Sequence, residues 1–206
     1  MSVKDKKKIA IVWEGYEAGG VDSYLSYLLN SWPTDDEFFI FHNIENLGID
    51  RLKSLLKREN INFKPVKTVF PYYNGKSFTS LFLKYFIHLI SPFLYLVNIR
   101  YYKNHLSKDN FDILIAQNGG YPGSLGVLSS CVGAKLAKIQ VITLVIHHAA
   151  NSPLPGHKIF RYFVEKSLSM ILSSVIAISN ATKETIESNT NLFKDPKKNI
   201  TVIENG

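Results

Sequence analysis

A glycine-rich turn follows the first apolar run of the chain and is written WEGYEAGGVDSYL, from Trp13 to Leu25. A strand, a glycine turn and a helix starting at Val21 would place backbone N–H groups and the positive end of a helix dipole at the carboxyl edge of a sheet. Gly19 and Gly20 lack Cβ atoms, so a ligand can pass close to the backbone there. The segment predicts contact with a phosphate, and a tight turn without a ligand is the alternative.

Two familiar phosphate-binding patterns do not fit this turn. Gly15 and Gly20 have the spacing of P-loop glycines, but Val21 and Asp22 stand where Lys and Ser or Thr are required. The second predicted strand ends at Asn43 without an acidic residue to hold a ribose, which argues against a nicotinamide cofactor. The sequence therefore predicts no cofactor.

His147 and His148 form the second candidate for chemistry. His147 is the first polar residue after the apolar run VITLVI, so it should emerge at the carboxyl edge, where open α/β sheets bind ligands. A buried structural histidine is the alternative. A metal site of His147, His148 and His157 is disfavoured, because adjacent residues rarely chelate one ion and no carboxylate flanks them. No metal is predicted.

Composition narrows the class of protein. With 206 residues and 46% hydrophobic content, the chain can bury a core and is interpreted as a single domain, residues 1–206. Its one cysteine, Cys131, excludes an intrachain disulfide, suits a reducing compartment and is expected to be buried and inert. The net charge of +7 favours an anionic partner. Nucleic acid is not the predicted partner, since no zinc-finger or RNA-binding signature is present.

The elements that must position these residues alternate along the chain. Short β-rich runs separated by helical segments predict an α/β fold, a Rossmann-like layer sandwich with a mainly parallel sheet of about seven strands. Continuously apolar runs are typical of strands covered by helices on both faces. The runs start at Lys8, Glu37, Ile61, Asp112, Gln140, Ser174 and Asn199, and helices are predicted at 21–30, 50–59, 77–106 with a break near Pro92, 124–137, 158–172 and 181–189.

The segment from Phe78 to Tyr102 is apolar nearly all round and rich in aromatic residues. Lys84, His88 and Pro92 interrupt it, so it is a poor membrane-spanning helix. It is interpreted either as two buried helices or as a face that docks on a bilayer. Nearby basic residues favour docking, namely Arg100, Lys103 and Lys108.

Several segments in order resemble one enzyme family. AGGVDSYL resembles the opening of the GT-B glycosyltransferases of the large retaining family 4, which use nucleotide-activated sugars. FDILIAQNGG is similar to the family's fourth strand and loop, VITLVIHHAANSP to its fifth strand, VIAISNATKETI to its sixth, and ITVIENG to the strand that leads into the second domain. The resemblance covers essentially the whole chain.

The resemblance implies an activity and a domain arrangement. Two Rossmann-like domains of this family face each other across a cleft, and the chain resembles the N-terminal, acceptor-side one, without the C-terminal nucleotide-sugar domain. The full-length protein is then expected to be a retaining hexosyltransferase, and this domain alone to be inactive. The expected partners are a sugar nucleotide as co-substrate and a glycan or lipid-linked acceptor, with peripheral membrane contact through residues 78–102. The expected setting is polysaccharide biosynthesis in the cytoplasm, at the inner face of the membrane.

The resemblance also implies roles for single residues. Gly19 and Gly20 would lie against the donor diphosphate or sugar, and His147 would contact the sugar as the catalytic candidate. Asp22 departs from the glutamate commoner at its place, and its role stays open. The acceptor-side candidates are Asn118, Gly119, Tyr121 and His148, with a simple turn as the alternative for the loop.

Ser179 is interpreted first as a helix cap and second as a ligand contact. Two further functions stay open for the whole chain. One is a stand-alone binding or membrane-anchoring half that recruits a separate catalytic subunit. The other is a different nucleotide-binding domain, such as half of a sugar-nucleotide epimerase.

Overall fold

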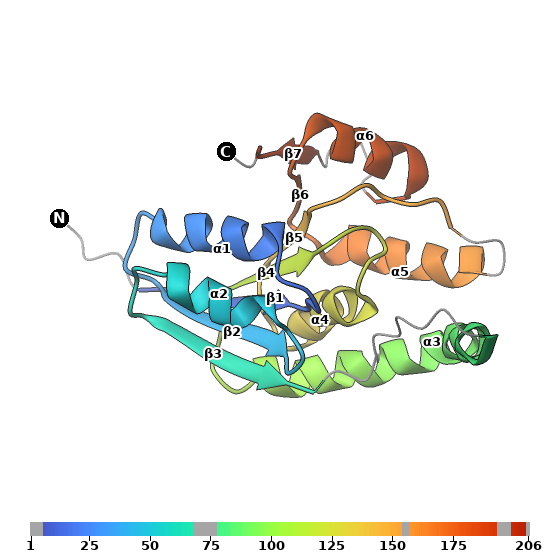
Figure 1. Cartoon of the computed structure of the whole chain (residues 1–206), viewed down its shortest axis with the longest axis horizontal. Helices are drawn as coiled ribbons and strands as arrows, with labels where there is room; N and C mark the ends of the chain where they lie inside the picture. The colour runs from blue at the N-terminus through green and yellow to red at the C-terminus, as the bar shows by residue number, and fades with distance from the viewer. Residues whose placement is uncertain (1–5, 68–77, 154–156, 193–198, 205–206) are drawn as a thin grey trace.

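Seven parallel strands form one sheet in the order β3-β2-β1-β4-β5-β6-β7 (Figure 1). The computed structural model describes residues 6–67, 78–153, 157–192 and 199–204, without the side chains of 78–88. The predicted parallel sheet is confirmed, and each predicted run forms a strand. The strands are β1 (Lys8–Trp13), β2 (Glu37–Asn43), β3 (Ile61–Val66), β4 (Ile113–Asn118), β5 (Val141–Ile146), β6 (Ser174–Ala177) and β7 (Ile200–Val202).

The strand order reverses at the centre of the sheet. β1 pairs in parallel with β2 on one side and with β4 on the other. From β1 the chain first adds strands toward β3 and then returns to add β4 through β7 on the opposite side. Ligands of open α/β sheets bind at such a reversal, beyond the carboxyl ends of the strands.

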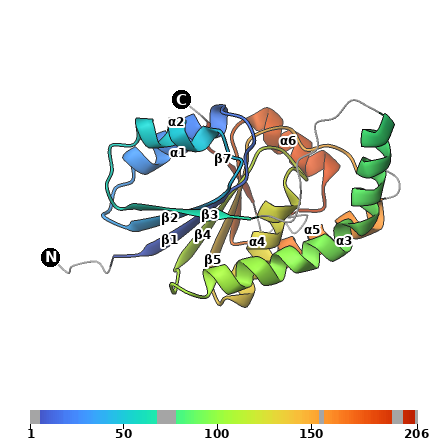
Figure 2. The same cartoon turned by 60° about the horizontal axis from the view of Figure 1, so that its bottom comes forward.

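The helices lie on both faces of the sheet, as continuously apolar strands require. Leu25 and Leu29 of α1 and Leu52 of α2 pack with Ile9 and Ile11 on one face. Residues of α3, α4 and α5 form the larger core on the other face, and Figure 2 shows α1 and α2 opposite α3 across strands β1 to β3. The helices are α1 (Gly20–Asn30), α2 (Gly48–Leu55), α3 (Phe78–Leu106), α4 (Leu125–Leu136), α5 (Lys158–Ile171) and α6 (Asn180–Asn189).

Two helix predictions need correction. The helix expected at 50–59 ends at Leu55, because Leu56 has extended backbone with ψ 134°. The break expected near Pro92 is absent, since α3 is helical on both sides of that proline. A proline inside a helix removes one hydrogen bond and bends the axis without necessarily ending the helix. Figure 2 shows that α3 changes direction along its length. Among the described residues, no helix combines the length and hydropathy needed to cross a membrane.

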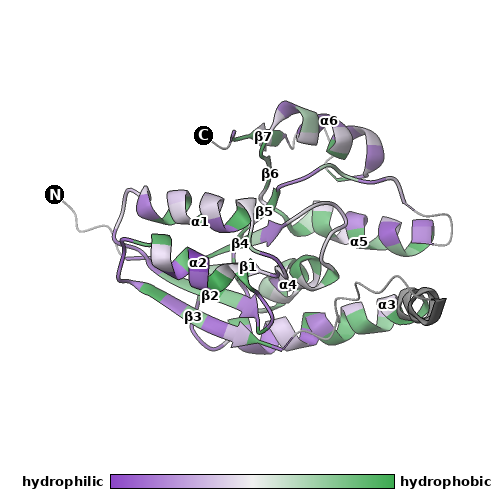
Figure 3. Ribbon diagram, in the orientation of Figure 1, coloured by the Kyte–Doolittle hydropathy of each residue, from purple (hydrophilic) through white to green (hydrophobic). Residues whose placement is uncertain are grey.

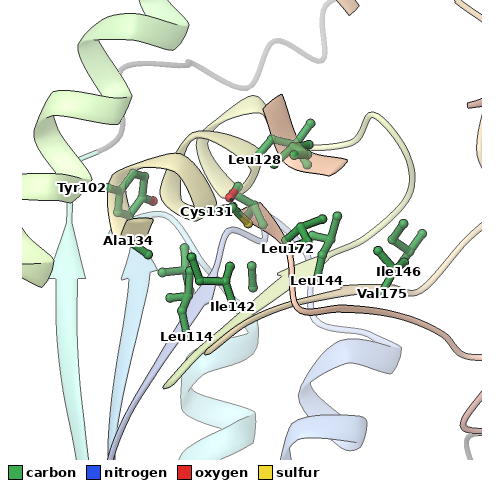
Figure 4. Packing of buried hydrophobic residues seen from close by; sticks show 14 of the residues in the cluster. Tyr102, Leu114, Leu128, Cys131, Ala134, Ile142, Leu144, Ile146, Leu172 and Val175 are labelled. Atoms are coloured by element: carbon green, nitrogen blue, oxygen red, sulfur yellow. Dashed lines mark hydrogen bonds between the residues drawn. The ribbon is translucent and has the colours of Figure 1, made fainter. Parts of the chain in front are cut away.

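The larger core surrounds the single cysteine. Cys131 is fully buried, and Figure 4 shows it among apolar side chains from α4, β4 and β5. Burial raises the pKa of its thiol to about 12, so the thiol stays protonated and inert, as predicted. Hydrophilic and hydrophobic residues lie side by side along α5 in Figure 3, as expected of a helix with one buried face.

A buried carboxylate joins three elements next to β1. Glu14 follows the strand directly and is 8% exposed. The hydroxyl of Tyr102 in α3 donates to its Oε1 at 2.9 Å, and the hydroxyl of Ser124, the N-cap of α4, donates to Oε2. Burial raises the pKa of the Glu14 carboxyl, and these two hydrogen bonds act in the opposite direction. A Cβ added at Gly126 would overlap Oε1 of Glu14. The carboxylate therefore requires glycine at this point of α4.

Replacing Gly126 by Ala should destabilise the chain by about 1–3 kcal/mol, because the added methyl group collides with the buried carboxylate. Gly119→Ala is the matched control, since nothing lies within 4 Å of its would-be Cβ. Urea unfolding measures both. Adding Glu14→Ala to Gly126→Ala should make the loss smaller than the sum of the single losses. Equal midpoints for Gly126→Ala and Gly119→Ala would show that the collision does not occur.

Candidate functional site

The candidate residues gather at the carboxyl edge where the strand order reverses. The glycine turn follows β1, the residue pair Gln117 and Asn118 ends β4, and His147 follows β5. β4 pairs in register with both β1 and β5, which places these ends side by side. The edge predicted from the sequence is therefore the edge that the fold builds.

His147 connects three elements. Its backbone N–H donates to the carbonyl of Asn118 at 3.0 Å, and its ring lies edge-on to Tyr24 of α1 with 4.9 Å between centroids. Its Nε2 lies 2.7 Å from Oε1 of Gln117. Because an amide oxygen only accepts, Nε2 carries the proton and Nδ1 is left as an acceptor. His147 is thus held by β4 and α1.

Burial keeps the imidazole neutral. His147 is 3% exposed. Desolvation, with a smaller contribution from the nearby His148, lowers its pKa to about 4. A neutral ring can exchange hydrogen bonds with a sugar hydroxyl, but at pH 7 it offers no positive charge to a phosphate. A neutral ring in this position suits contact with a polar, uncharged group.

Gln117 is a candidate site residue that the sequence pattern does not single out. Its side chain is fully buried, and Nε2 has no hydrogen-bond partner among the described residues. A buried amide donor without a partner is uncommon and calls for a water or a ligand oxygen. The only signal in the sequence was a polar residue near the end of the apolar strand ILIAQN.

The glycine turn is open, but one of its backbone N–H groups already donates a hydrogen bond within the protein. Nothing lies within 4 Å of a Cβ added at Gly19 or Gly20, so a ligand can approach both closely. The N–H of Gly19 donates to Oδ2 of Asp22 at 2.9 Å, and Arg51 of α2 lies 3.3 Å from Oδ1. Asp22 thus caps α1 and satisfies one of the orphan donors of its first turn. An anion seeking the Gly19 N–H must displace this carboxylate.

The loop after β4 is shaped by Asn118, the last residue of that strand. Oδ1 of Asn118 accepts from the Ser124 N–H at 3.0 Å, and its Nδ2 donates to the Pro122 carbonyl at 2.9 Å. Tyr121 is 1% exposed. Of the predicted acceptor-side residues, Gly119 is half-buried and His148 exposed, so these two offer surface to a ligand.

The remaining sequence predictions can also be placed. Ser179 accepts from the Thr182 N–H at 3.1 Å, which confirms it as the N-cap of α6. Within the described ranges, no group of three or more His, Cys, Asp or Glu side chains is arranged to hold a metal ion.

Comparison with known proteins shows the fold alone. No protein-family profile and no curated protein matches the chain. A glycosyltransferase from Rickettsia africae is 19% identical with a TM-score of 0.58, over 98% of this chain and 44% of that one. A putative UDP-N-acetylglucosamine 2-epimerase from Listeria monocytogenes is 10% identical with a TM-score of 0.54, over 94% and 44%. Anabaena HepE, solved with UDP-glucose, is 13% identical with a TM-score of 0.52, over 94% and 43%.

The chain has the fold of one GT-B domain. It spans less than half the length of each of these solved structures. Transferases and epimerases share this GT-B half, so the fold does not select one reaction, and the function depends on the residues of the site.

The free energy of unfolding of the GT-B domain should fall as the pH drops below 6.5. His147 alone should account for a loss of up to about 3 kcal/mol. The unfolded ring takes up a proton near its ordinary pKa of 6.5, whereas the folded ring does so only near 4. Its contribution is therefore full above pH 6.5 and is lost toward pH 4. Urea unfolding at several pH values should give a flatter profile for His147→Gln than for the parent, with His148→Gln as the exposed control. Parallel profiles for His147→Gln and the parent would show that the pKa of His147 is not lowered in the folded chain.

Proposed function

We propose that the chain is the acceptor-binding, N-terminal domain of a retaining glycosyltransferase, which moves a sugar from a nucleotide diphosphate to a glycan or lipid-linked acceptor at the cytoplasmic face of a membrane. One observation carries the proposal. The buried, neutral His147 and the unpartnered amide of Gln117 lie together at the edge where the strand order reverses.

The chemistry of this pair suits a sugar. Nδ1 of His147 is an acceptor and Nε2 of Gln117 a donor, and a sugar hydroxyl both donates and accepts. Neither group carries charge at pH 7, so the pair can recognise hydroxyls without attracting ions. The UDP-glucose bound to Anabaena HepE, a protein of the same fold, supports a nucleotide sugar as donor.

The diphosphate needs more positive charge than the glycine turn supplies. Asp22 occupies the Gly19 N–H and also pairs with Arg51, so these groups are already engaged within the protein. We therefore place the main stabilisation of the leaving diphosphate outside this chain, with Gly19 and Gly20 providing room for close approach. The transfer is proposed to be metal-independent, so it should persist in EDTA.

Replacing His147 by Ala should lower turnover at least about tenfold, since one hydrogen bond lost from the transition state is worth that much. The assay follows release of nucleoside diphosphate from a panel of sugar nucleotides, using the gene product as the source cell makes it. Immunoblotting and mass spectrometry should show a product about twice the 23.4 kDa of this chain, if one more domain follows. His105→Ala, near the end of α3 and so at the opposite edge of the sheet, is the control. Unchanged turnover in His147→Ala would remove this residue from the mechanism.

The same assay distinguishes a transferase from an epimerase, the alternative that the similarity to the putative Listeria epimerase supports. An epimerase would convert a free sugar nucleotide to its epimer without any acceptor. A transferase would release nucleoside diphosphate only when acceptor is added.

A second candidate function is a binding half that docks on a membrane, and a patch of exposed apolar residues favours it. On α3, Leu89 is 78% exposed, Phe93 68% and Leu96 63%, at helical spacing on one side. Arg100 and Lys103 continue this stripe and are exposed. On α5 the exposed apolar residues include Ile159, Tyr162 and Phe163. Apolar side chains beside basic ones are typical of a surface that contacts anionic lipid.

Replacing Phe93 by Glu should reduce binding to anionic vesicles about tenfold, because it removes an apolar contact and adds a repelled charge. Co-sedimentation with phosphatidylglycerol vesicles measures the bound fraction, which should also fall as salt is added. Tyr27→Glu is the matched control, an aromatic residue 70% exposed on α1, on the other face of the sheet. Equal losses in both variants, or no binding by the parent, would exclude docking through α3.

A further inference from the structure

A cavity of about 450 Å³ lies between α3, α4, α5 and the loops that follow β4 and β5. It is on the face of the sheet opposite α1, away from the open glycine turn. Its volume is in the range of ordinary small-molecule sites. The apolar part of the lining consists of Pro122, Leu125, Leu128, Pro153, Phe160 and Val164.

The charged group in the lining is already neutralised. Nε of Arg161 lies 2.6 Å from Oε1 of Glu165, and both side chains are more than nine-tenths buried. The other guanidinium nitrogens donate to the carbonyls of Asn151 and Asn189, at 2.5 and 3.0 Å. The positive charge of Arg161 is therefore balanced by Glu165 within the protein, which disfavours a phosphate or a carboxylate as its further partner.

The hydroxyl of Ser152 is also engaged. Its Oγ donates to Oδ1 of Asn189 at 3.0 Å. An apolar chain would leave the bonds of Ser152 and Arg161 in place, and the buried hydroxyl of Tyr121, which also lines the cavity and has no hydrogen-bond partner among the described residues, is left for one polar group of a ligand. The cavity therefore suits a ligand that is mostly hydrocarbon and carries a polar, uncharged group.

We propose that this cavity binds one acyl chain of a neutral glycerolipid. Two helices that border it, α3 and α5, carry the exposed apolar residues Leu89, Phe93, Ile159 and Phe163 on their outward sides. A lipid that leaves a bilayer beside these helices would reach the cavity without its chain crossing water. An isoprenoid carrier is the weaker fit, because its first carbon bears a phosphate and the charge of Arg161 is already balanced by Glu165.

That this lipid is the acceptor of transfer rests on the proposed function. The acyl chain would hold the acceptor while its headgroup extends past Gly123 and Ser152 toward the carboxyl edge of the sheet. Binding itself needs no donor and no second domain, so it can be measured on the chain alone.

Isothermal titration of the 206-residue chain with monodecanoylglycerol, below its critical micelle concentration, tests the proposal. One saturable site is expected. Leu125→Trp should weaken it at least about tenfold by filling the cavity. Leu136→Trp, at the exposed end of α4, is the matched control and should bind within about twofold of the parent. Circular dichroism checks that both variants fold.

A second experiment uses the chain without any substitution, so its result does not depend on whether a variant folds. With methyl-labelled protein, nuclear Overhauser contacts should join the chain protons of monodecanoylglycerol to the methyl groups of Leu125, Leu128 and Val164. Contacts confined to Leu89, Leu96 and Ile159 would place the lipid on the outer surface and overturn the proposal. Tighter binding of farnesyl phosphate at this site would overturn the choice of an acyl chain.

The two proposals fail separately. If the chain binds monodecanoylglycerol but the gene product transfers no sugar, the cavity stands and the acceptor role falls. If transfer occurs and the lipid does not bind in the cavity, the transferase stands and the lipid site falls.

Discussion

The pairing of β1 with both β2 and β4 is the constraint on which the rest of the structure depends. Parallel strands in register end at the same edge, so Trp13, His42 and Gln117 are brought level although they lie far apart in the sequence. The strand order reverses at β1. The helices α1 and α2 pack on one face of the sheet, and α3, α4 and α5 pack on the other face. The edge beyond β1 is therefore reached from both layers of helices.

The two layers use this edge differently. On the α1 side, the edge holds an uncharged polar pair, His147 and Gln117, with unused hydrogen-bonding capacity at the amide. On the α4 side, Glu14 is bonded to Tyr102 and Ser124, and its carboxylate ties the end of β1 to α3 and α4. The polar groups on the α4 side are thus bonded within the protein, whereas the amide donor of Gln117 on the α1 side has no partner among the described residues.

The fold narrows the function without selecting it. A glycosyltransferase and an epimerase both share this GT-B half at under 20% identity. What separates such reactions is the chemistry of a few side chains at the edge and the part of the protein that supplies charge to the leaving group. The neutral site found here is consistent with binding of sugar hydroxyls, and Asp22 at the start of α1 argues against strong phosphate binding by this domain alone.

The sequence by itself determined the sheet and the strand ends at which the candidate residues lie. Apolar runs of strand length alternating with helical segments predicted the parallel fold, because both are local patterns that burial on two faces imposes. The position of His147 after an apolar strand was enough to place it at the edge. Only the tertiary structure decided its state, since the amide of Gln117, the ring of Tyr24 and burial come from other elements and keep the imidazole neutral. The same holds for Glu14, Asn118 and the cavity beside α5, because each depends on side chains that meet only after the strands have paired.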